Sequence, residues 1–190
     1  LTDVTGVQTC ALPISGDRAP EFRLQDLRGA TRTLAEFRGK VVVLEWINVD
    51  CPFVKKHYGS GNMQALQRTW QARGVVWLLV ASSAPGKQGH YAAAAWPGLL
   101  TERKAAPTAL LLDPAGNAGR AYGAKTTPHL FVIDKTGRLA YTGAIDDRPS
   151  TNPADIAGAK NHVAAALAAV LAGKPVVLAD TKPYGCSVKY

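Results

Sequence analysis

The sequence from residue 40 to residue 56 reads KVVVLEWINVDCPFVKK, and it predicts a buried strand that runs directly into a helix. Residues 40–47 are apolar and rich in β-branched side chains, which is typical of a strand buried on both faces. Pro52 suits the first turn of a helix, because its missing N–H would have no partner there. Cys51 is therefore expected at the junction between a core strand and a helix.

The rest of the chain alternates between short apolar runs and helical segments. Strands are expected at residues 22–27, 75–81, 108–112, 130–134 and 139–143. Helices are expected at residues 52–73 with a loosening at 59–61, at 91–104 with a break at Pro97, at 117–122, and at 153–171 between an Asn152 N-cap and a Gly173 stop. This order predicts one α/β domain with a mixed central sheet, parallel in its βαβ units and closed by an antiparallel hairpin.

Length and composition exclude several classes of protein. The chain has 190 residues, which suits one domain, and no apolar run reaches the ~20 residues needed to span a bilayer. The net charge of +8 is scattered without a basic block, so we interpret it as solubilising and expect no nucleic-acid partner. No phosphate-binding loop is present, and the acidic pair Asp146-Asp147 has no third ligand nearby, so neither a cofactor nor a metal is expected.

The first fifteen residues, LTDVTGVQTCALPIS, have no strand or helix period and lack the basic start and apolar core of a signal peptide. They resemble translated sequencing-adapter read-through. We therefore expect a non-native leader at residues 1–15, a domain at 16–172 and a tail at 173–190. On this interpretation Cys10 has no functional meaning, and the natural start is missing together with any targeting signal, which leaves the bacterial cytoplasm and the periplasm as alternatives.

Cys51 is the candidate nucleophile. The N–H groups and the dipole at a helix N-terminus stabilise a thiolate, and Lys55, one turn further on, would add positive potential. The neighbouring carboxylate of Asp50 would raise the pKa of the Cys51 thiol unless it points into water. The alternative is an inert, buried thiol, which is a common fate for a free cysteine.

At these residues the chain resembles thioredoxin-fold redox proteins, with CPFV at residues 51–54 where their motif is Cys-x-x-Cys. Residues 16–34 resemble the opening segment of the alkyl-hydroperoxide-reductase and thiol-disulfide redoxin group, and TTP at 126–128 resembles their cis-proline loop. GAIDD at 143–147 and the tail YGCSVKY at 184–190 are similar to a bacterial peroxiredoxin-like family with one active-site cysteine. The resemblance implies a thioredoxin-like fold and a thiol-dependent oxidoreductase.

The chain departs from the pattern of typical peroxiredoxins, Pro-x-x-x-Thr-x-x-Cys. Leu44 and Asn48 stand where that pattern has Pro and Thr. Asn48 must therefore orient a peroxide in place of the threonine, or peroxide turnover is poor. Pro128 stands about where peroxiredoxins carry an arginine, so Arg148 is a candidate substitute cation, with an ordinary surface turn residue as the alternative.

Pro128 has a physical argument of its own, because X-Pro bonds adopt the cis form far more readily than other peptide bonds. By resemblance, a cis bond would present the backbone of Thr127 beside the cysteine, where it could bind an extended substrate chain. The alternative is a trans proline at the start of a strand.

Glu45 lies in an otherwise apolar strand, where thioredoxins have a buried acid at the corresponding place. Burial would raise its pKa and let it exchange protons with the thiol. The alternative is a partly exposed glutamate paired with a lysine.

Cys186 is a candidate resolving cysteine, because Val54 leaves Cys51 without a local partner. We expect the Cys51 thiolate to attack a peroxide oxygen or a disulfide sulfur, and a mobile tail to bring Cys186 to the oxidised product. This predicts a Cys51–Cys186 disulfide. The alternative is a structural thiol that docks the tail.

Two classes of function follow. The first is an enzyme, either a peroxide reductase or a thiol-disulfide reductase, which acts on a peroxide or a protein disulfide and uses a thiol donor such as a thioredoxin. The second is a non-catalytic thioredoxin-fold module that holds an extended peptide in a groove at Thr127 and Pro128.

Overall fold

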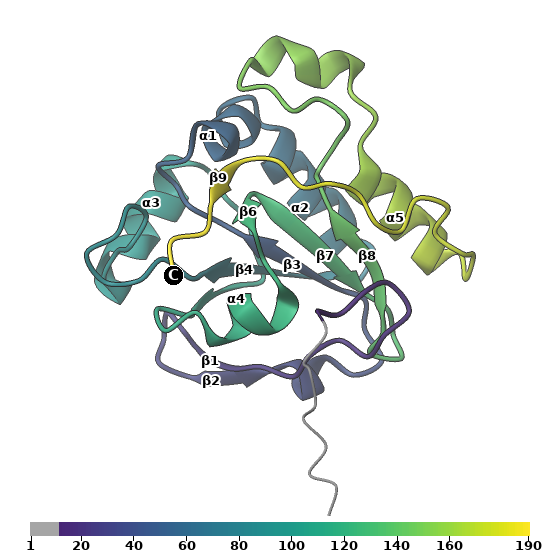
Figure 1. The fold of residues 1–190 in the computed structure, drawn as a ribbon, viewed down its shortest axis with the longest axis horizontal. Coiled ribbons are helices and arrows are strands. Elements are labelled where there is room, and N and C mark those ends of the chain that lie inside the picture. Colours follow the sequence, from purple (N-terminus) through teal and green to yellow (C-terminus); the bar gives the residue numbers. More distant parts are fainter. Residues whose placement is uncertain (1–11) are drawn as a thin grey trace, which may run out of the picture.

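The computed structural model describes residues 12–190, and it contains one large mixed sheet (Figure 1). The strands of this sheet are β1 (Arg23–Asp26), β2 (Thr31–Thr33), β3 (Val42–Trp46), β4 (Val76–Ala81), β5 (Ala109–Leu112), β7 (His129–Ile133) and β8 (Leu139–Gly143). Their order is β2-β1-β5-β4-β3-β7-β8. β3, β4 and β5 are parallel, whereas the β1–β2 and β7–β8 hairpins are antiparallel. The predicted mixed α/β sheet is confirmed.

The helices cover both faces of the sheet. They are η1 (Leu34–Phe37), α1 (Pro52–Gly59), α2 (Asn62–Gln71), η2 (Ala93–Ala95), α3 (Trp96–Glu102), α4 (Asn117–Tyr122), η3 (Pro153–Gly158) and α5 (His162–Leu171). Val43 and Trp77 face one core together with α1, α2, α3 and α5, while Leu44 and Leu78 face a second core with η1 and α4. Because successive strand residues point to opposite faces and both faces are covered, β3 and β4 are apolar except for Glu45.

Two predicted helices differ from those observed. Pro97 does not break a helix, because it lies in the first turn of α3, where its missing N–H costs nothing. The single helix predicted at 153–171 is wrong, because the chain forms the 3-10 turn η3 and then α5. Asn152 caps η3 as predicted, but Asn161 starts α5 by accepting a hydrogen bond from the N–H of Ala164 at 2.8 Å.

The predicted loosening between residues 59 and 61 is confirmed. The helical stretch divides into α1 and α2, and Gly61 adopts a φ of +79° at the division. This left-handed conformation favours glycine, so the local sequence explains the break.

The last eighteen residues return across the domain and add a second, two-stranded sheet of β6 (Thr126–Thr127) and β9 (Cys186–Ser187) (Figure 1). Upstream of β9, the N–H of Thr142 donates to the carbonyl of Ala179 at 2.9 Å. Downstream of it, the N–H of Ala84 donates to the carbonyl of Lys189 at 2.7 Å. The tail is thus fixed on both sides of Cys186, and no excursion is needed to bring that residue to the domain.

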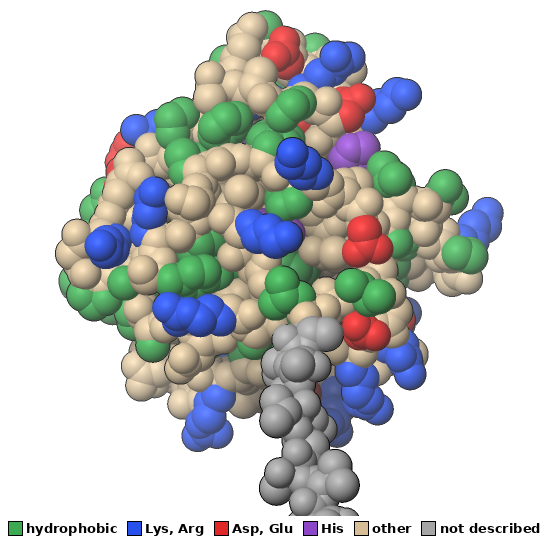
Figure 2. Space-filling model, viewed as in Figure 1, with side chains coloured by type: hydrophobic (Ala, Val, Ile, Leu, Met, Phe, Trp, Pro, Cys, Tyr) green, Lys and Arg blue, Asp and Glu red, His purple; other side chains and the backbone are tan. Residues whose placement is uncertain are grey.

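The surface shows no concentration of positive charge on the face drawn in Figure 2, where Lys and Arg side chains are dispersed among neutral ones. Within residues 12–190, none of the helices combines the length and the apolar character that crossing a bilayer would require.

Candidate active site

Cys51 lies where the sequence predicts it, at the N-cap of α1 and directly after the core strand β3. Its φ and ψ of −68° and 127° are extended, its carbonyl accepts the first helical hydrogen bond from Lys55 at 2.9 Å, and Pro52 follows in the first turn. The side chain is fully buried. The thiol therefore sits at the positive end of a helix inside the core.

Three segments of the chain meet at the Cys51 sulfur. Its Sγ lies 3.0 Å from the carbonyl oxygen of Thr127, and the backbone N–H of Cys186 points to the same sulfur from 3.4 Å. Thr127 and Cys186 are paired directly across the β6–β9 sheet. The helix start, the loop before β7 and the tail thus converge on one thiol.

The two thiols differ in acidity. Burial by itself raises the pKa of the Cys51 thiol, but hydrogen bonds from the Cys186 side chain and from the backbone N–H groups of Val54 and Cys186 outweigh it, so the pKa falls below its ordinary value. Burial raises the pKa of Cys186, and its hydrogen bond to Cys51 raises it further. Of the pair, Cys51 is the thiol that ionises first.

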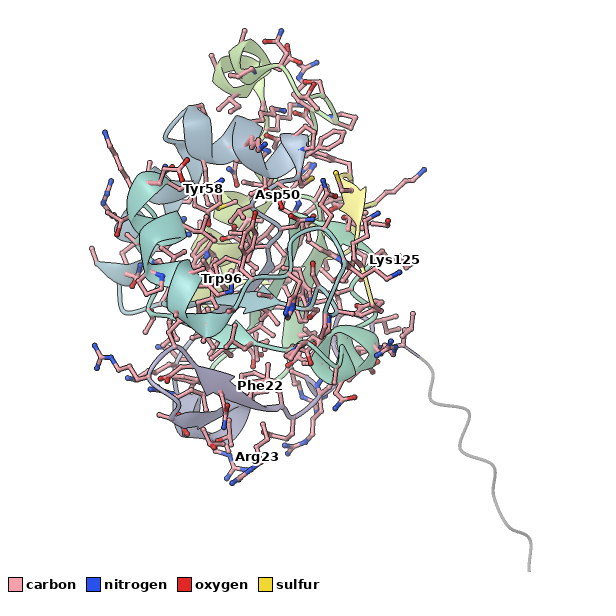
Figure 3. All side chains as sticks on the ribbon, turned by 90° about the vertical axis from the view of Figure 1, so that its left-hand side faces the viewer. Phe22, Arg23, Asp50, Tyr58, Trp96 and Lys125 are labelled. Carbon is pink, nitrogen blue, oxygen red and sulfur yellow. The ribbon has the colours of Figure 1, made fainter. Side chains whose placement is uncertain are left out.

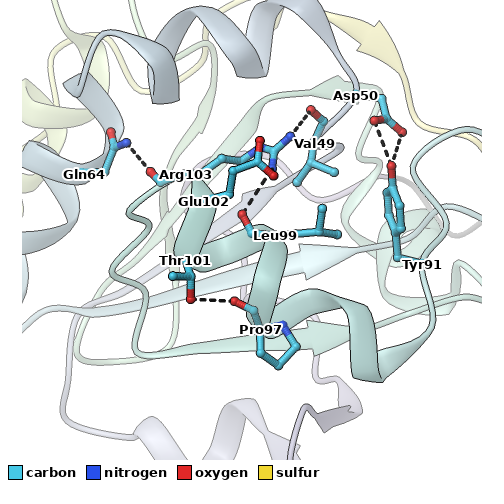
Figure 4. A network of polar contacts seen from close by, with 9 residues as sticks. All are labelled: Val49, Asp50, Gln64, Tyr91, Pro97, Leu99, Thr101, Glu102 and Arg103. Carbon is cyan, nitrogen blue, oxygen red and sulfur yellow. Dashed lines mark hydrogen bonds and ion pairs between the residues drawn. The ribbon is translucent and has the colours of Figure 1, made fainter.

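The charges next to Cys51 in sequence are not what shifts this pKa. Asp50 accepts hydrogen bonds from the Tyr91 hydroxyl at 2.9 and 3.0 Å, and the Arg103 guanidinium bonds to the Val49 carbonyl at 3.2 Å (Figure 4). Lys55 is exposed. Lys55 is therefore not among the causes of the lowered Cys51 pKa, which are hydrogen bonds from the backbone and from the tail.

The Thr127-Pro128 peptide bond is cis, as predicted. The Thr127 carbonyl oxygen faces Cys51 and also leaves no room beside Gly185, where any side chain would collide with it. Gly185 has a φ of +144°, a conformation that L residues with side chains rarely adopt. The edge expected to hold an extended substrate is occupied by the chain's own tail.

Asn48 is buried beneath the turn that leads into α1. Its Oδ1 accepts a hydrogen bond from the N–H of Asp50 at 2.9 Å, and its Nδ2 has no hydrogen-bond partner among residues 12–190. The side chain packs so closely against Gly89 that a Cβ there would collide with it. The Asn48 amide oxygen thus holds the turn that leads into α1, and its NH2 group makes no hydrogen bond within the described residues.

Among residues 12–190, no hydrogen bond or ion pair joins the Arg148 side chain to either cysteine. Its side chain is about half exposed, and its Nε lies 3.6 Å from Asp147. Its backbone is held by the Asp146 carboxylate, which accepts from the Arg148 N–H at 2.9 Å, and by Lys56, whose Nζ donates to the Arg148 carbonyl at 2.8 Å. The structure favours the surface-turn interpretation over that of a cation at the thiol.

Glu45 is fully buried, so the interpretation of a partly exposed glutamate paired with a lysine is wrong. Its carboxylate accepts hydrogen bonds from Tyr58 at 2.9 Å, Trp77 at 2.7 Å and Gln67 at 3.4 Å. Burial raises its pKa to about 7, although these hydrogen bonds pull the other way. Its hydrogen bonds reach neither cysteine, so any exchange of protons with them is indirect.

Sequence reasoning missed the polar cluster beside the tail, which consists of His57, Tyr184 and Asp146. The His57 Nε2 lies 3.1 Å from the Tyr184 hydroxyl, which in turn donates to the Asp146 carboxylate at 2.5 Å. Tyr184 belongs to the recognised tail motif, two residues before Cys186, and that spacing was the available signal. The cysteine Cys10 lies outside the described residues, and within residues 12–190 no cluster of three metal-binding side chains occurs.

A thiol at the start of a helix that follows a core strand, opposite a cis-proline loop, defines a thioredoxin-like thiol protein. In Figure 3, Asp50 is labelled just before the start of α1, and Lys125 is labelled beside β9. The chain belongs to the AhpC/TSA family, whose family model matches residues 15–142.

The thiol-disulfide oxidoreductase ResA of Geobacillus thermodenitrificans is 29% identical over 124 residues, which cover 65% of this chain and 66% of that protein. An uncharacterized conserved protein from Geobacillus kaustophilus superposes with a TM-score of 0.78 at 25% identity and covers 95% of this chain and 93% of its own. A Chlorobium tepidum protein assigned as the thiol:disulfide interchange protein DsbE has a TM-score of 0.56 at 26% identity, covering 70% and 85% of the two chains. These similarities support the thioredoxin-like fold and a redox role based on cysteine.

Proposed function

We propose that this protein is a thiol-disulfide oxidoreductase in which Cys51 and Cys186 alternate between two thiols and one disulfide. The observation that carries the proposal is the convergence on the Cys51 sulfur, where the backbone nitrogen of Cys186 lies 3.4 Å away and donates a hydrogen bond to it. On this proposal residues 16–172 form the catalytic domain, and residues 173–190 are a tail that supplies the second thiol.

The proposed reaction conserves electrons in two steps. The Cys51 thiolate attacks one sulfur of a substrate disulfide, so that its S–S bond breaks and the first substrate thiolate leaves. Cys186 then loses its proton and attacks the Cys51 sulfur, which releases the second substrate thiolate and forms the Cys51–Cys186 disulfide. The substrate gains two electrons and two protons, and an external dithiol, such as a thioredoxin, returns the pair to the reduced state.

Glu45 is the proposed store for the proton that the thiols release. A pKa of about 7 lets a carboxyl group take up and release a proton near neutral pH. Because its hydrogen bonds run to Tyr58, Trp77 and Gln67, we expect it to act through the local field and through solvent rather than by direct contact. Glu45→Gln should then slow the exchange at pH 7 without abolishing it.

A disulfide is the favoured substrate over a peroxide. The position of the peroxidase threonine holds Asn48, whose Oδ1 is already engaged by the backbone of Asp50. Arg148 lies at the surface beside Asp147 and offers no charge to a peroxide oxygen. The name of the relative ResA, a thiol-disulfide oxidoreductase, points the same way.

The alternative of a non-catalytic peptide-binding module has less support. The β6 edge that such a module would use is paired with the chain's own β9. A binding module also has no need for a thiol with a lowered pKa. Cys51 is buried beneath the tail, however, so either function requires the tail to shift before a protein substrate can reach the sulfur.

The test compares wild type, Cys51→Ser and Cys186→Ser in turnover of oxidised glutathione, of a protein disulfide and of hydrogen peroxide, with dithiothreitol as the reductant. We expect wild type to reduce disulfides faster than peroxide, Cys51→Ser to be inactive, and Cys186→Ser to accumulate a mixed disulfide on Cys51 that mass spectrometry detects. Equal inactivity of wild type and Cys51→Ser on all three substrates would support the binding module instead. Faster turnover of peroxide than of disulfides would reverse the choice of substrate.

A further inference from the structure

Tyr184 joins the tail to the helix that begins at Cys51. Its ring centroid lies 5.7 Å from that of Phe53 and 6.4 Å from that of His57, and the Lys56 ammonium lies 5.7 Å from the ring centroid. These three side chains occupy one face of α1, at positions i, i+3 and i+4. The side chain two residues before Cys186 is therefore seated on the same helix whose N-terminus holds Cys51.

The Tyr184 hydroxyl is fixed by a directed chain of hydrogen bonds. It donates to the Asp146 carboxylate at 2.5 Å, so the contact with His57 at 3.1 Å must come from an Nε2–H donor on the imidazole. The His57 Nδ1 is then the acceptor of the Asn62 amide at 2.9 Å. Burial lowers the pKa of His57 to about 4, which agrees with a neutral ring in this tautomer.

The far end of the chain of hydrogen bonds is also held in place. Asp146 is buried and accepts a second hydrogen bond from the N–H of Arg148 at 2.9 Å. A carboxylate with two charge-assisted hydrogen bonds in a buried place is a rigid acceptor. The position of the Tyr184 hydroxyl is thus set from both sides, by Asp146 and by α1.

Only Gly185 separates this anchor from Cys186. Gly185 lies against the Thr127 carbonyl without room for a side chain, and Cys186 is next paired with Thr127 in the β6–β9 sheet. A shift of Tyr184 must therefore move Cys186 relative to the Cys51 sulfur, because Gly185, the one residue between Tyr184 and Cys186, is itself held in place.

We propose that Tyr184 is the positioning residue for Cys186, and that its hydrogen bond to Asp146 raises the effective concentration of the Cys186 thiol at Cys51. The inference rests on the proposed function, since it assumes that the two cysteines form a disulfide. When they do, the two thiols lose two electrons and two protons to oxidised glutathione, which becomes two molecules of reduced glutathione. The equilibrium constant of this exchange is the effective concentration of one thiol at the other.

The test measures that constant in the full chain by equilibration with mixtures of reduced and oxidised glutathione, acid quenching and mass analysis. Tyr184→Phe keeps the ring on α1 and removes only the hydroxyl. We expect it to lower the effective concentration about tenfold, as the loss of a hydrogen bond to a charged group does. Tyr122→Phe is the matched control, because its buried hydroxyl donates to the Pro20 carbonyl at 2.7 Å and does not touch the tail, so its constant should equal that of wild type.

Asp146→Asn tests the same hydrogen bond from the acceptor side. We expect it to lower the constant by itself and to add little to Tyr184→Phe, because both substitutions remove one interaction. If Tyr184→Phe leaves the constant within twofold of wild type, or if Tyr122→Phe lowers it equally, Tyr184 has no positioning role. If wild type forms no Cys51–Cys186 disulfide at any glutathione ratio, the proposed function itself is wrong.

Discussion

Glu45 places an ionisable group in the centre of the main sheet, and its protonation couples folding to pH. Its side chain is fully buried, and its pKa rises from 4.5 to about 7 because burial disfavours the carboxylate. Three hydrogen-bond donors stabilise the carboxylate without reversing the shift. The folded state therefore holds this proton over a range in which the unfolded chain has already released it.

The sign of the resulting pH dependence follows from linkage. The raised pKa of Glu45 stabilises the folded state fully below about pH 4.5, where the carboxyl group is protonated. This contribution to the free energy of unfolding is lost as the pH rises through about 7. We expect the difference in free energy of unfolding between wild type and Glu45→Gln to fall by about 3 kcal/mol from pH 4.5 to pH 8. Urea unfolding at several pH values measures it, and pH effects from His57 and His129 cancel in the difference. A difference that stays constant from pH 4.5 to pH 8 would contradict the prediction.

At the scale of elements, the tail is the part that controls access to the thiol. Tyr190 anchors the end of the tail on α4. Its hydroxyl donates to the Ala124 carbonyl at 2.8 Å, and the Arg120 guanidinium lies 4.6 Å from its ring centroid. Gly116 and Gly119 leave the space that this ring fills, since a Cβ at either would collide with it. Together with Tyr184 on the other side, this seat holds Cys186 over Cys51.

Loosening that seat should expose the Cys51 sulfur. We expect Tyr190→Ala to raise the rate of Cys51 alkylation by iodoacetamide about tenfold. The substitution removes one hydrogen bond and the packing of the ring, and so lowers the free energy of local opening of the tail. Peptide mapping by mass spectrometry gives the rate at each cysteine. Val177→Ala is the matched control, because this tail side chain is fully exposed and its loss should change nothing. Equal rates in wild type and Tyr190→Ala would show that the tail does not limit access.

At the scale of the whole molecule, the two thiols span most of the chain. Cys51 and Cys186 are 135 positions apart, so a disulfide between them would close a loop that contains β4, β5, β7 and β8. Closing such a loop removes conformational entropy from the unfolded state far more than from a native state in which both residues are already together. Redox state and stability should therefore be coupled.

The oxidised protein should be the more stable form. For a loop of this length the chain-entropy model gives about 5 kcal/mol. Urea unfolding of the protein equilibrated with oxidised or with reduced dithiothreitol measures the difference. Cys186→Ser should unfold identically in both conditions, and equal stability of oxidised and reduced wild type would contradict the prediction.

The sequence alone predicts the elements whose signals are local. The run KVVVLEWI, Pro52 after Cys51 and the hairpin at residues 130–143 each carry their pattern within a few residues, and the mixed sheet follows from their order. The cis bond before Pro128 and the burial of Glu45 were also within reach, since each depends on one residue in one strand or loop. The division at residues 158–162 was missed because the alanine-rich stretch favours a helix on both sides of it.

Tertiary structure alone decided how the site is assembled. The sequence identified Cys51 and Cys186 as the two thiols to consider, but only packing puts the Cys186 N–H on the Cys51 sulfur and β9 along β6. The same holds for Tyr184, whose partners His57 and Asp146 are 127 and 38 positions away. Contacts between residues so distant in the chain leave no periodic pattern, because they depend on where the whole sheet places its edges.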